Sequence, residues 1–440
     1  MVKQALIIAG GKGTRLGDIG RSVPKALVPV GGRPLLAHLL AWCARYHLED
    51  VRILAGHMGD QIESFVHRHR VAGLHVSVST EDIPLGTAGA LHLVAKALHE
   101  DFLVLYGDVF VDFDPGPMCA LHKERKPVAT LLTRASDHPW DSHIVDVGPE
   151  GFVREFIAKR EPGRLYRNLS NAAVYVCSRR VLNFIPEAVP VDFGGQVFPS
   201  ILDAGEKLAS WELRTPGFVK DMGTQDRLRD LEAWLEERDW IAQARQAKLP
   251  VKTVFIDRDG TLTVEREGIC RPEELKLLPG AAAGVRILNE AGIRTVLVTN
   301  QSVVARGLCS IKELEIIHRK LQGDLADCGA RLDAIYYSPF HPETHHAEGV
   351  LEYRRASRCR KPDVGMLMQA VRELAVDLRA SILVGNSRTD IETARNAEIR
   401  SILVESPRLP AEGVQPEWHF ASLCEAAKAI VDGRCNQLPR

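Results

Sequence analysis

Short apolar runs alternate with longer amphipathic segments in the first half of the chain. Buried-strand patterns occupy Ala5–Ala9, Val51–Ala55 and Leu103–Tyr106, and helical patterns occupy Pro34–Tyr46 and the segment that begins at Gln61. Strands that alternate with helices are typical of a largely parallel sheet with helices on both faces. The pattern therefore predicts an α/β fold.

The same rhythm restarts after a polar stretch. Residues Thr224–Gln246 are charged and helical in pattern, and we interpret them as a closing helix and linker. At about 100–200 residues per domain, a chain of 440 residues is long enough for two domains. We predict domains at residues 1–235 and 251–440, joined by a helical linker at 236–250. The strand patterns of the second domain are Thr253–Ile256, Thr295–Val298, Ala334–Tyr337, Ile382–Val384 and Ser401–Val404.

Composition narrows the class of protein. The chain has 56 basic and 57 acidic residues, so it lacks the basic excess that is usual in nucleic-acid-binding proteins. It has no apolar run of about 18 residues that would predict a membrane-spanning helix, and its start leads into glycines instead of a signal-peptide cleavage site. Nine scattered cysteines without a Cys-x-x-Cys pair indicate free thiols in a reducing compartment. We expect a cytoplasmic protein without nucleic-acid or membrane partners.

A glycine-rich loop follows the first strand and reads Gly-Gly-Lys-Gly-Thr-Arg-Leu. Glycines let backbone amides approach phosphates, and an arginine adds a forked cation suited to phosphate oxygens. The spacing alone is equally compatible with a plain tight turn. A stiff, proline-flanked segment then presents Lys25. The loop residues that we expect to contact a phosphate chain are Gly10, Gly11, Gly13, Thr14 and Arg15.

These two segments together resemble the signature of the sugar-phosphate nucleotidyltransferases, over about residues 3–235. The resemblance implies a Rossmann-like (GT-A-like) sheet that binds a nucleoside triphosphate and a sugar phosphate. Asp108 in Tyr-Gly-Asp and Asp221 in Lys-Asp-Met-Gly-Thr are similar to the two magnesium ligands of the family. The residues that match those binding the base, the sugar and the sugar phosphate are Gly86, Thr87, Gly89, Asn171 and Lys159.

The implied reaction brings two phosphates together and therefore needs cations. Mg²⁺ on Asp108 and Asp221 would neutralise the α-phosphate. Arg15 and Lys25 would stabilise the departing pyrophosphate. Taken singly, each aspartate is more typical of a strand-end cap or a solvated loop residue, and only the order of the motifs favours the catalytic interpretation. Ala158 stands where the family usually has a glutamate, which affects the expected contacts to the sugar.

The second domain opens with a strand that runs into Asp257-Arg-Asp259-Gly-Thr. This segment resembles the first motif of the haloacid-dehalogenase-like phosphatases, and the resemblance, over about residues 251–432, implies a Rossmannoid sheet. Asp257 would attack phosphorus and form an aspartyl-phosphate. Asp259 would protonate the leaving alcohol and later activate water. Alternation along an extended chain puts both carboxylates on the same side. An ordinary aspartate-rich turn is the competing interpretation.

Three further segments, Thr-Asn-Gln-Ser, Cys-Arg-Lys-Pro and Gly-Asn-Ser-Arg-Thr-Asp, match the family in order. The resemblance implies that Lys361 is a catalytic cation for the phosphoryl oxygens. It implies that the substrate is bound by Thr299, Asn300, Gln301, Ser302 and Arg360. It implies that Mg²⁺ is bound by Asp257, Asp259, Asn386 and Asp390. Asn386 replaces the aspartate that relatives usually carry, and Asp390, four residues later, is the candidate to compensate.

The order of these motifs resembles, more specifically, the branch that contains heptose bisphosphate phosphatases and histidinol phosphatases, and Thr299–Gly307 favours the heptose enzymes. Relatives usually carry a zinc loop with three cysteines and a histidine, but here only Cys359 clearly remains, with His341 nearby. Tetrahedral zinc needs four nitrogen or sulfur ligands, so we expect no structural zinc. His345 and His346 are the alternative ligands, although adjacent loop histidines are more often solvated.

The two resemblances together predict a bifunctional enzyme. The phosphatase would convert heptose 1,7-bisphosphate into heptose 1-phosphate, and the transferase would consume that product, with GTP favoured by analogy, to make a nucleotide-activated heptose for lipopolysaccharide or S-layer glycans. A second hypothesis changes the substrates to mannose or glucose 1-phosphate and another small ester such as histidinol phosphate. A third makes one half a sensor without turnover. Both catalytic hypotheses imply Mg²⁺ in both domains.

Overall fold

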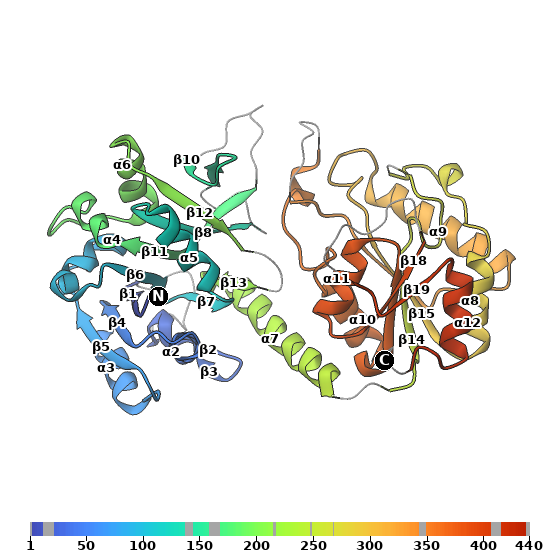
Figure 1. Cartoon of the computed structure of the whole chain (residues 1–440), viewed down its shortest axis with the longest axis horizontal. Coiled ribbons are helices and arrows are strands. Elements are labelled where there is room, and N and C mark those ends of the chain that lie inside the picture. Colours follow the sequence, from blue (N-terminus) through green and yellow to red (C-terminus); the bar gives the residue numbers. More distant parts are fainter. Residues whose placement is uncertain are drawn as a thin grey trace. The chain divides into compact units, whose positions relative to one another are not determined.

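The computed structural model describes residues 2–11, 22–136, 144–157, 168–213, 217–246, 249–266, 268–342, 349–405 and 415–436. The chain divides into two compact units, Met1–Glu236 and Glu237–Arg440 (Figure 1). The predicted alternation of strands and helices is confirmed in both units, and every strand predicted from the sequence is present.

The N-terminal unit contains a nine-stranded sheet in the order β10-β9-β11-β6-β1-β4-β5, to which β8 adds at β11 and β12 adds at β8. Strands β5, β4, β1 and β6 are parallel, whereas β11 is antiparallel to both β6 and β8. The strands are β1 (Gln4–Ala9), β4 (Asp50–Ala55), β5 (His75–Thr80), β6 (Asp101–Tyr106), β8 (Ala129–Ala135), β9 (Ile144–Val147), β10 (Val153–Ile157), β11 (Leu169–Ser178) and β12 (Leu208–Glu212).

Alternate residues of the central strands enter two different cores. Ile7 packs in a core with Leu36 of the first long helix, whereas Leu6 packs in a second core with Leu91 and Phe198. Both faces of the sheet are therefore covered, as expected for strands that read as continuous apolar runs. The helical segments are η2 (Lys25–Leu27), α2 (Leu35–Arg45), α3 (Gly59–Arg68), α4 (Gly86–Gly89), η3 (Ala90–Ala97), α5 (Gly116–Arg125), η4 (Arg179–Phe184), η5 (Phe193–Val197), α6 (Phe198–Asp203) and α7 (Gln225–Gln246).

Two small ribbons complete the N-terminal unit. Strand β2 (Pro29–Val30) pairs with β3 (Arg33–Pro34), just after the segment that carries Lys25. Strand β7 (Val109–Asp112) pairs antiparallel with β13 (Phe218–Asp221), in a register that places Asp221 opposite Val109. The amide of Met222 also donates to the carbonyl of Asp108 across 2.9 Å. The ribbon thus brings the two predicted metal-binding aspartates together from distant parts of the sequence.

The C-terminal unit is built on a six-stranded parallel sheet in the order β16-β15-β14-β17-β18-β19. Parallel strands of this kind, joined by helices, place their carboxyl ends at one edge, where ligands of open α/β sheets bind. The strands are β14 (Thr253–Ile256), β15 (Arg294–Asn300), β16 (Ala334–Ser338), β17 (Ser381–Gly385), β18 (Arg400–Val404) and β19 (Trp418–Phe420).

Helices cover both faces of this second sheet (Figure 1). Ile256 packs in one core with Val285, Leu314 and Ile430, while Phe255 packs in the other with Met368. The residues of β14 thus alternate between the two helical layers, which fixes the direction in which the following residue, Asp257, leaves the sheet. The helical segments are α8 (Ala281–Glu290), α9 (Ile311–Asp327), α10 (Gly365–Leu374), α11 (Arg388–Asn396), α12 (Leu423–Val431), η6 (Pro272–Glu274), η7 (Leu351–Tyr353) and η8 (Leu378–Ala380).

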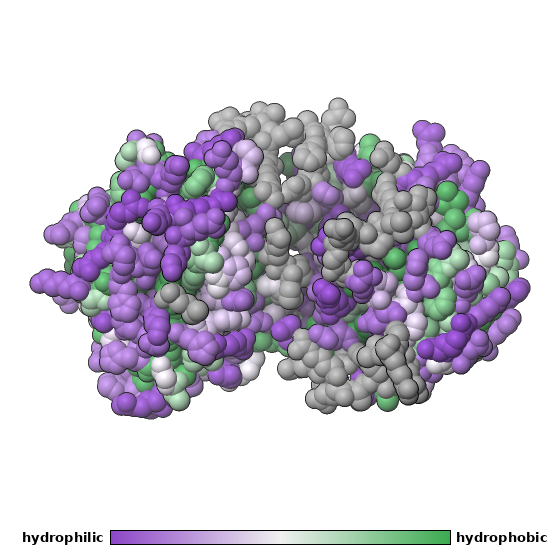
Figure 2. Space-filling view, in the orientation of Figure 1, coloured by the Kyte–Doolittle hydropathy of each residue, from purple (hydrophilic) through white to green (hydrophobic). Residues whose placement is uncertain are grey.

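The surface of each unit is mostly polar. Figure 2 shows hydrophilic residues over much of the visible face, with apolar residues between them. Across the ranges that the structure describes, no helix is both long and apolar enough to cross a lipid bilayer.

Candidate active sites

A cavity of about 510 Å³ lies at the carboxyl ends of β1 and β6 in the N-terminal unit. Glycine, lysine and aspartate from different sequence motifs meet here, which is the arrangement that phosphate chemistry requires. The predicted residues that line it are Gly11, Lys25, Thr87, Asp108, Asn171 and Asp221. Gly13, Thr14, Arg15 and Lys159 lie outside the described residues.

Each of the two aspartates in this cavity carries a cationic partner. Lys25 Nζ donates to Asp108 Oδ2 across 2.8 Å, and Arg227 Nη1 donates to Asp221 Oδ1 across 2.6 Å. Carboxylate oxygens are hard donors that suit Mg²⁺, which is usually held by one or two carboxylates together with substrate phosphates. The donor set therefore fits a magnesium ion, and the two cations are placed to contact phosphate oxygens.

One wall of the cavity is a network of neutral polar groups. Asn171 Nδ2 donates to the hydroxyl of Tyr175 across 2.9 Å, and its Oδ1 accepts from the amide of Ala173 at 3.0 Å. The ring of Tyr106 meets that of Tyr175 edge-on, and burial raises the pKa of Tyr106 to about 12. Thr87 Oγ1 accepts from the amide of Phe193 at 3.1 Å. These groups remain uncharged at neutral pH and can orient a sugar or a base by hydrogen bonds.

Three predicted glycines shape the loops around the cavity without lining it. Gly86 has a φ of +74°, and a Cβ there would lie 2.4 Å from the carbonyl oxygen of Val191. A side chain would therefore displace the turn that carries Thr87. Gly10 and Gly89 are similarly close to Glu81 and to the backbone of residue 189.

Two arginines that the sequence analysis missed also line the cavity: Arg134, from β8, and Arg227, from the first turns of α7. Arg227 lies six residues after Asp221. A basic residue so close in sequence to a predicted metal ligand could have indicated that Arg227 belongs to the site. Arg134 carried no comparable signal, because its position depends on the pairing of Arg134 with Ser170 in the sheet.

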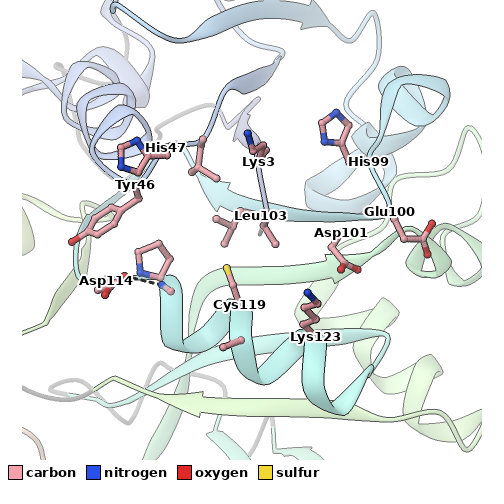
Figure 3. Close-up of a pocket in the computed structure, with 15 residues that line it drawn as sticks. Lys3, Tyr46, His47, His99, Glu100, Asp101, Leu103, Asp114, Cys119 and Lys123 are labelled. Atoms are coloured by element: carbon pink, nitrogen blue, oxygen red, sulfur yellow. Dashed lines mark hydrogen bonds between the residues drawn. The ribbon is translucent and has the colours of Figure 1, made fainter.

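A larger cavity, of about 740 Å³, lies at the opposite, amino-terminal ends of β1 and β6 (Figure 3). Cys119 and Lys123 of α5 point into it, and Tyr46 and His47 border it. None of the predicted site residues contributes to its lining. Size alone therefore does not identify the active site of this unit, because the residues suited to phosphate chemistry line the smaller cavity.

In the C-terminal unit a cavity of about 400 Å³ lies at the carboxyl ends of β14, β15 and β17. It gathers residues from all the motifs that were matched in this domain. The predicted residues that line it are Asp257, Asp259, Thr299, Asn300, Gln301, Ser302, Lys361 and Asn386. Arg360 and Asp390 are not part of this lining.

Lys361 is the centre of the charge network at this site. Its Nζ donates to Asp257 Oδ1 across 2.7 Å, to Asp390 Oδ1 across 2.5 Å and to the carbonyl of Val298 across 3.0 Å. Asn300 holds the backbone of Lys361 with two hydrogen bonds, each of 3.0 Å. Although burial lowers the pKa of Lys361, the two carboxylates outweigh burial and raise it, so the ammonium remains charged.

Asp390 is fully buried and belongs to the start of α11. Its Oδ2 accepts from the amide of Ser387 at 3.0 Å and from the hydroxyl of Ser387 at 2.5 Å, in a reciprocal capping arrangement. A Cβ on Gly385 would lie 2.3 Å from the carboxyl carbon of Asp390. Asp390 can therefore orient Lys361 from the side away from the cavity. Asn386, by contrast, lines the cavity.

Lys361 is shared between two carboxylates at this site, so neither Asp257 nor Asp390 has a cation of its own. Burial, together with the nearby charges of Asp390 and Asp259, raises the pKa of Asp257 to about 7 even though Lys361 opposes the shift. In the described part of the chain no three His, Cys, Asp or Glu side chains converge as a ready metal site. The oxygens of Asp257 and Asn386 remain at the cavity, and two such donors with a substrate phosphate fit Mg²⁺.

Two arginines lie close together beside the cavity. Arg306 lines it, and Arg360 Nη1 donates to the carbonyl of Phe340 across 2.9 Å. Burial and then the positive charge of Arg306 lower the pKa of Arg360 to about 10. Within the residues that the structure describes, the side chain of Arg306 forms no hydrogen bond or ion pair. Arg306, which the sequence analysis did not single out, is thus available to an anionic ligand.

The segment in which the sequence resemblance implied a zinc loop is held by aromatic contacts. The guanidinium of Arg355 lies 4.4 Å above the ring of Phe340, which is 5.7 Å from the ring of Tyr353. The amide of His341 donates to the carbonyl of Tyr353 across 3.0 Å. Burial raises the pKa of Cys359, so its thiol stays protonated. His345 and His346 lie outside the described residues.

The family model described as nucleotidyl transferase matches residues 4–238, more than half of the chain. The chain belongs to the nucleotidyl transferase family. A second model, described as HAD-hydrolase-like, matches residues 358–425 of the C-terminal unit.

The C-terminal unit of this nucleotidyl transferase is also homologous to a group of phosphatases. The D-glycero-β-D-manno-heptose-1,7-bisphosphate 7-phosphatase of Yersinia pestis is 37% identical over 183 residues, which cover 41% of this chain and 95% of that protein. The D-glycero-D-manno-heptose-1,7-bisphosphate 7-phosphatase of Thermosynechococcus vestitus is 44% identical over 161 residues, covering 36% and 81%. The chain is therefore an enzyme with a nucleotidyltransferase unit and a HAD-like phosphatase unit, which confirms the predicted pair of families and the fold class.

Solved structures resemble each unit separately. HddC from Yersinia pseudotuberculosis covers 53% of this chain and all of its own, with 20% identity and a TM-score of 0.46. The D,D-heptose 1,7-bisphosphate phosphatase from B. bronchiseptica, solved with magnesium and phosphate, covers 41% of this chain and 99% of its own, with 29% identity and a TM-score of 0.35.

Proposed function

We propose that the chain makes a nucleotide-activated heptose in two consecutive steps. The C-terminal unit hydrolyses D-glycero-D-manno-heptose 1,7-bisphosphate to heptose 1-phosphate and phosphate. The N-terminal unit then transfers a nucleotidyl group, GMP from GTP, to heptose 1-phosphate and releases pyrophosphate. The observation that carries this proposal is the 37% identity to a heptose bisphosphate 7-phosphatase in a chain whose other unit is a nucleotidyl transferase. The product of the first reaction has the chemistry of a substrate for the second.

The phosphatase step follows from the residues at the C-terminal cavity. Asp257 attacks the phosphorus at C7, the bond to the sugar oxygen breaks, and Asp259 donates a proton to that oxygen. Water then attacks the aspartyl-phosphate and gives a proton to Asp259, which releases phosphate and restores the Asp257 carboxylate. Lys361, held by Asp390 and Asn300, neutralises the phosphoryl oxygens during both steps.

The retained phosphate provides a second point of recognition. Arg306 lines the same cavity as Asp257, and its side chain has no ion-pair partner among the described residues. A guanidinium fork fits phosphate oxygens with two parallel hydrogen bonds. We assign Arg306, with Arg360 beside it, to the phosphate at C1, which supports a bisphosphate rather than a monoester as the substrate.

The transfer step needs no covalent intermediate. An oxygen of the sugar phosphate attacks the α-phosphorus of the nucleotide in line, and pyrophosphate leaves. Lys25 and Arg227 lie at the cavity with Asp108 and Asp221 and stabilise the negative charge that develops. Mg²⁺ held by oxygens of Asp108 and Asp221 here, and of Asp257 and Asn386 in the other unit, would supply additional neutralisation of phosphate charge. We also propose a cytoplasmic location, because the proposed reaction uses a nucleoside triphosphate.

A one-pot assay with two single-site variants tests the proposal. The protein is incubated with heptose 1,7-bisphosphate, Mg²⁺ and each nucleoside triphosphate in turn, and phosphate, pyrophosphate and sugar nucleotide are followed by mass. Wild type with GTP should yield all three products. Asp257→Asn should fail on the bisphosphate but still convert heptose 1-phosphate. Asp108→Asn should release phosphate and accumulate heptose 1-phosphate.

Each failure has a distinct meaning. If phosphate appears without any sugar nucleotide, the transferase acts on another sugar and the second step is wrong. If another nucleoside triphosphate replaces GTP, only the base assignment is wrong. If the bisphosphate is not hydrolysed at all, the heptose proposal is wrong for both units.

A further inference from the structure

Arg258, which stands between the nucleophile Asp257 and Asp259, is completely buried. Its guanidinium is paired with Asp259 in a two-pronged arrangement, with Nε donating to Oδ1 and Nη2 donating to Oδ2, each across 2.9 Å. A fork of this kind fixes both the position and the plane of a carboxylate. The side chain of Asp259 itself is 25% exposed and reaches the cavity.

The guanidinium is held in turn by two side chains from other elements. Nη2 also donates to Gln301 Oε1 across 2.8 Å, and Nη1 lies 3.3 Å from His318 Nε2. Burial, and then the charge of Arg258, lower the pKa of His318 to about 3, so the imidazole is neutral and Nε2 can accept this hydrogen bond. His318 comes from α9 and does not line the cavity.

The carboxylate of Asp259 has two further donors beside it. Gln301 Nε2 donates to Oδ2 across 2.9 Å. Thr263 Oγ1 lies 3.2 Å from both Oδ1 and the carbonyl oxygen of Arg258, and its single proton can go to either. Oδ2 thus has two donors, whereas Oδ1 keeps a lone pair for the transferred proton when Thr263 donates to the carbonyl of Arg258. Gln301 therefore contacts both members of the pair and joins them into a single cluster.

A buried arginine needs an explanation, because removing a guanidinium from water is costly and an apolar side chain would fill the space more cheaply. Stability alone does not explain the choice of residue here. The partner of Arg258 is the one carboxylate that must face the leaving group in the proposed phosphatase reaction. A rigid support for that group has a direct catalytic use, because general acid catalysis depends on hydrogen-bond geometry.

We propose that Arg258 is the positioning residue of the general acid–base Asp259, and that Gln301 and His318 hold Arg258 in place. The proposal rests on the phosphatase function proposed above. In the first step Asp259 gives its proton to the sugar oxygen as the bond from phosphorus to that oxygen breaks. In the second step it accepts a proton from the attacking water. Arg258 touches neither the substrate nor the proton and acts only through the orientation of Asp259.

The leaving group provides a test that general damage to the site does not imitate. A sugar alkoxide needs a proton to leave, whereas p-nitrophenolate does not. Arg258→Met should lower kcat/KM for the heptose bisphosphate by about 100-fold or more, the usual contribution of a positioned acid. It should lower kcat/KM for p-nitrophenyl phosphate by less than about fivefold. Asp259→Asn should show the same split, and the double variant should be no slower than Asp259→Asn, because the two residues act as one unit.

A pair of substitutions at His318 decides the matter if Arg258→Met does not fold. His318→Leu removes the acceptor for Arg258 Nη1 but leaves every cavity residue in place, and should give the same split between the two esters in a weaker form. His318→Gln retains an acceptor and should restore the rate on the heptose ester. Equal losses on both esters, in the Arg258 or the His318 variants, would overturn the proposal. Wild type that hydrolyses neither ester would instead refute the phosphatase function itself.

Discussion

Lys361 Nζ donates to Asp257 Oδ1 across 2.7 Å, yet the pKa of Asp257 is raised to about 7. The reason is that the lysine is shared: its ammonium also donates to the buried carboxylate of Asp390, and Asp259 lies close by. Burial then penalises the charged form of Asp257 more than its share of the lysine favours it. Lys361 therefore neutralises Asp257 only in part, and a divalent cation can balance the remaining charge of this carboxylate.

This imbalance predicts a pH-dependent stability of the metal-free protein. A carboxyl whose pKa is raised by folding stabilises the folded state below its unfolded pKa, and that stability is lost as pH rises toward the folded value. In EDTA, the C-terminal unit should become less stable between pH 4 and about 7. Asp257→Asn should raise its Tm by a few degrees at pH 8 and have little effect at pH 4. A gain of the same size at both pH values in thermal unfolding would contradict the account.

We predict that Asn386 determines how strongly the phosphatase unit depends on Mg²⁺. Its amide oxygen lies at the cavity beside Asp257 but carries no charge. Asn386→Asp adds a carboxylate and should lower the Mg²⁺ concentration for half-maximal phosphate release by about tenfold. In EDTA the same substitution should lower the Tm, because one more buried carboxylate then lacks a cation.

The matched control for this prediction is Asn396→Asp. Asn396 is the last residue of α11, and its side chain donates to the carbonyl of Pro362 and does not face the cavity. It should leave the Mg²⁺ dependence unchanged. An Asn386→Asp enzyme with an unaltered Mg²⁺ titration would show that residue 386 does not contact the ion.

We predict that Arg306 distinguishes bisphosphates from monophosphates. Arg306→Met should raise KM for heptose 1,7-bisphosphate by about 10- to 100-fold, the size expected for a charge-assisted hydrogen bond. KM for heptose 7-phosphate, which lacks the phosphate at C1, should change by less than about threefold. Arg306→Lys should recover part of the loss, because it keeps the charge but not the fork. Equal changes in KM for both esters would remove Arg306 from the recognition of the second phosphate.

We predict that Arg227, which donates to Asp221, supports nucleotidyl transfer. Arg227→Met should lower kcat/KM for sugar nucleotide formation by about tenfold or more, since a cation at the reacting phosphates is lost. Phosphate release from the bisphosphate should be unaffected, because the phosphatase belongs to the other unit. Arg229 is the control: it lies on the same helix but is exposed and pairs with Asp226. Similar losses in the Arg227→Met and Arg229→Met proteins would mean that the effect is not local to the cavity.

The sequence was sufficient to predict strands with continuous apolar runs, because such runs are buried on both faces of a parallel sheet. Several other strands were not predicted. Strands β9 and β10 give no comparable run, since they are partly exposed and antiparallel. Strands β8 and β11 were also missed, although they are largely buried, because polar residues interrupt their apolar runs. The order of the motifs also placed some of the predicted residues together at each cavity, because motifs at strand ends converge at one edge of the sheet. Arg134, Arg227 and Arg306 line the same cavities and were missed.

The hydrogen-bond partners of the site residues were harder to predict from the sequence. Asp390 was predicted as a metal ligand, but the structure engages both of its oxygens, one with Lys361 and one with Ser387. Which partner a buried carboxylate takes depends on distances between elements that are far apart in the chain. The role of Arg258 was not predicted for the same reason, because its partners Gln301 and His318 lie far from it in the sequence.

The ribbon of β7 and β13 has a consequence for the order in which the protein becomes active during synthesis. It joins Val109 to Asp221, so the strand that positions one aspartate of the transferase site leaves the ribosome long before the strand that carries the other. A nascent chain that ends short of β13 has Lys25 and Asp108 but lacks the second carboxylate. The transferase site is therefore completed only when translation has passed residue 221, just before synthesis of the phosphatase unit begins.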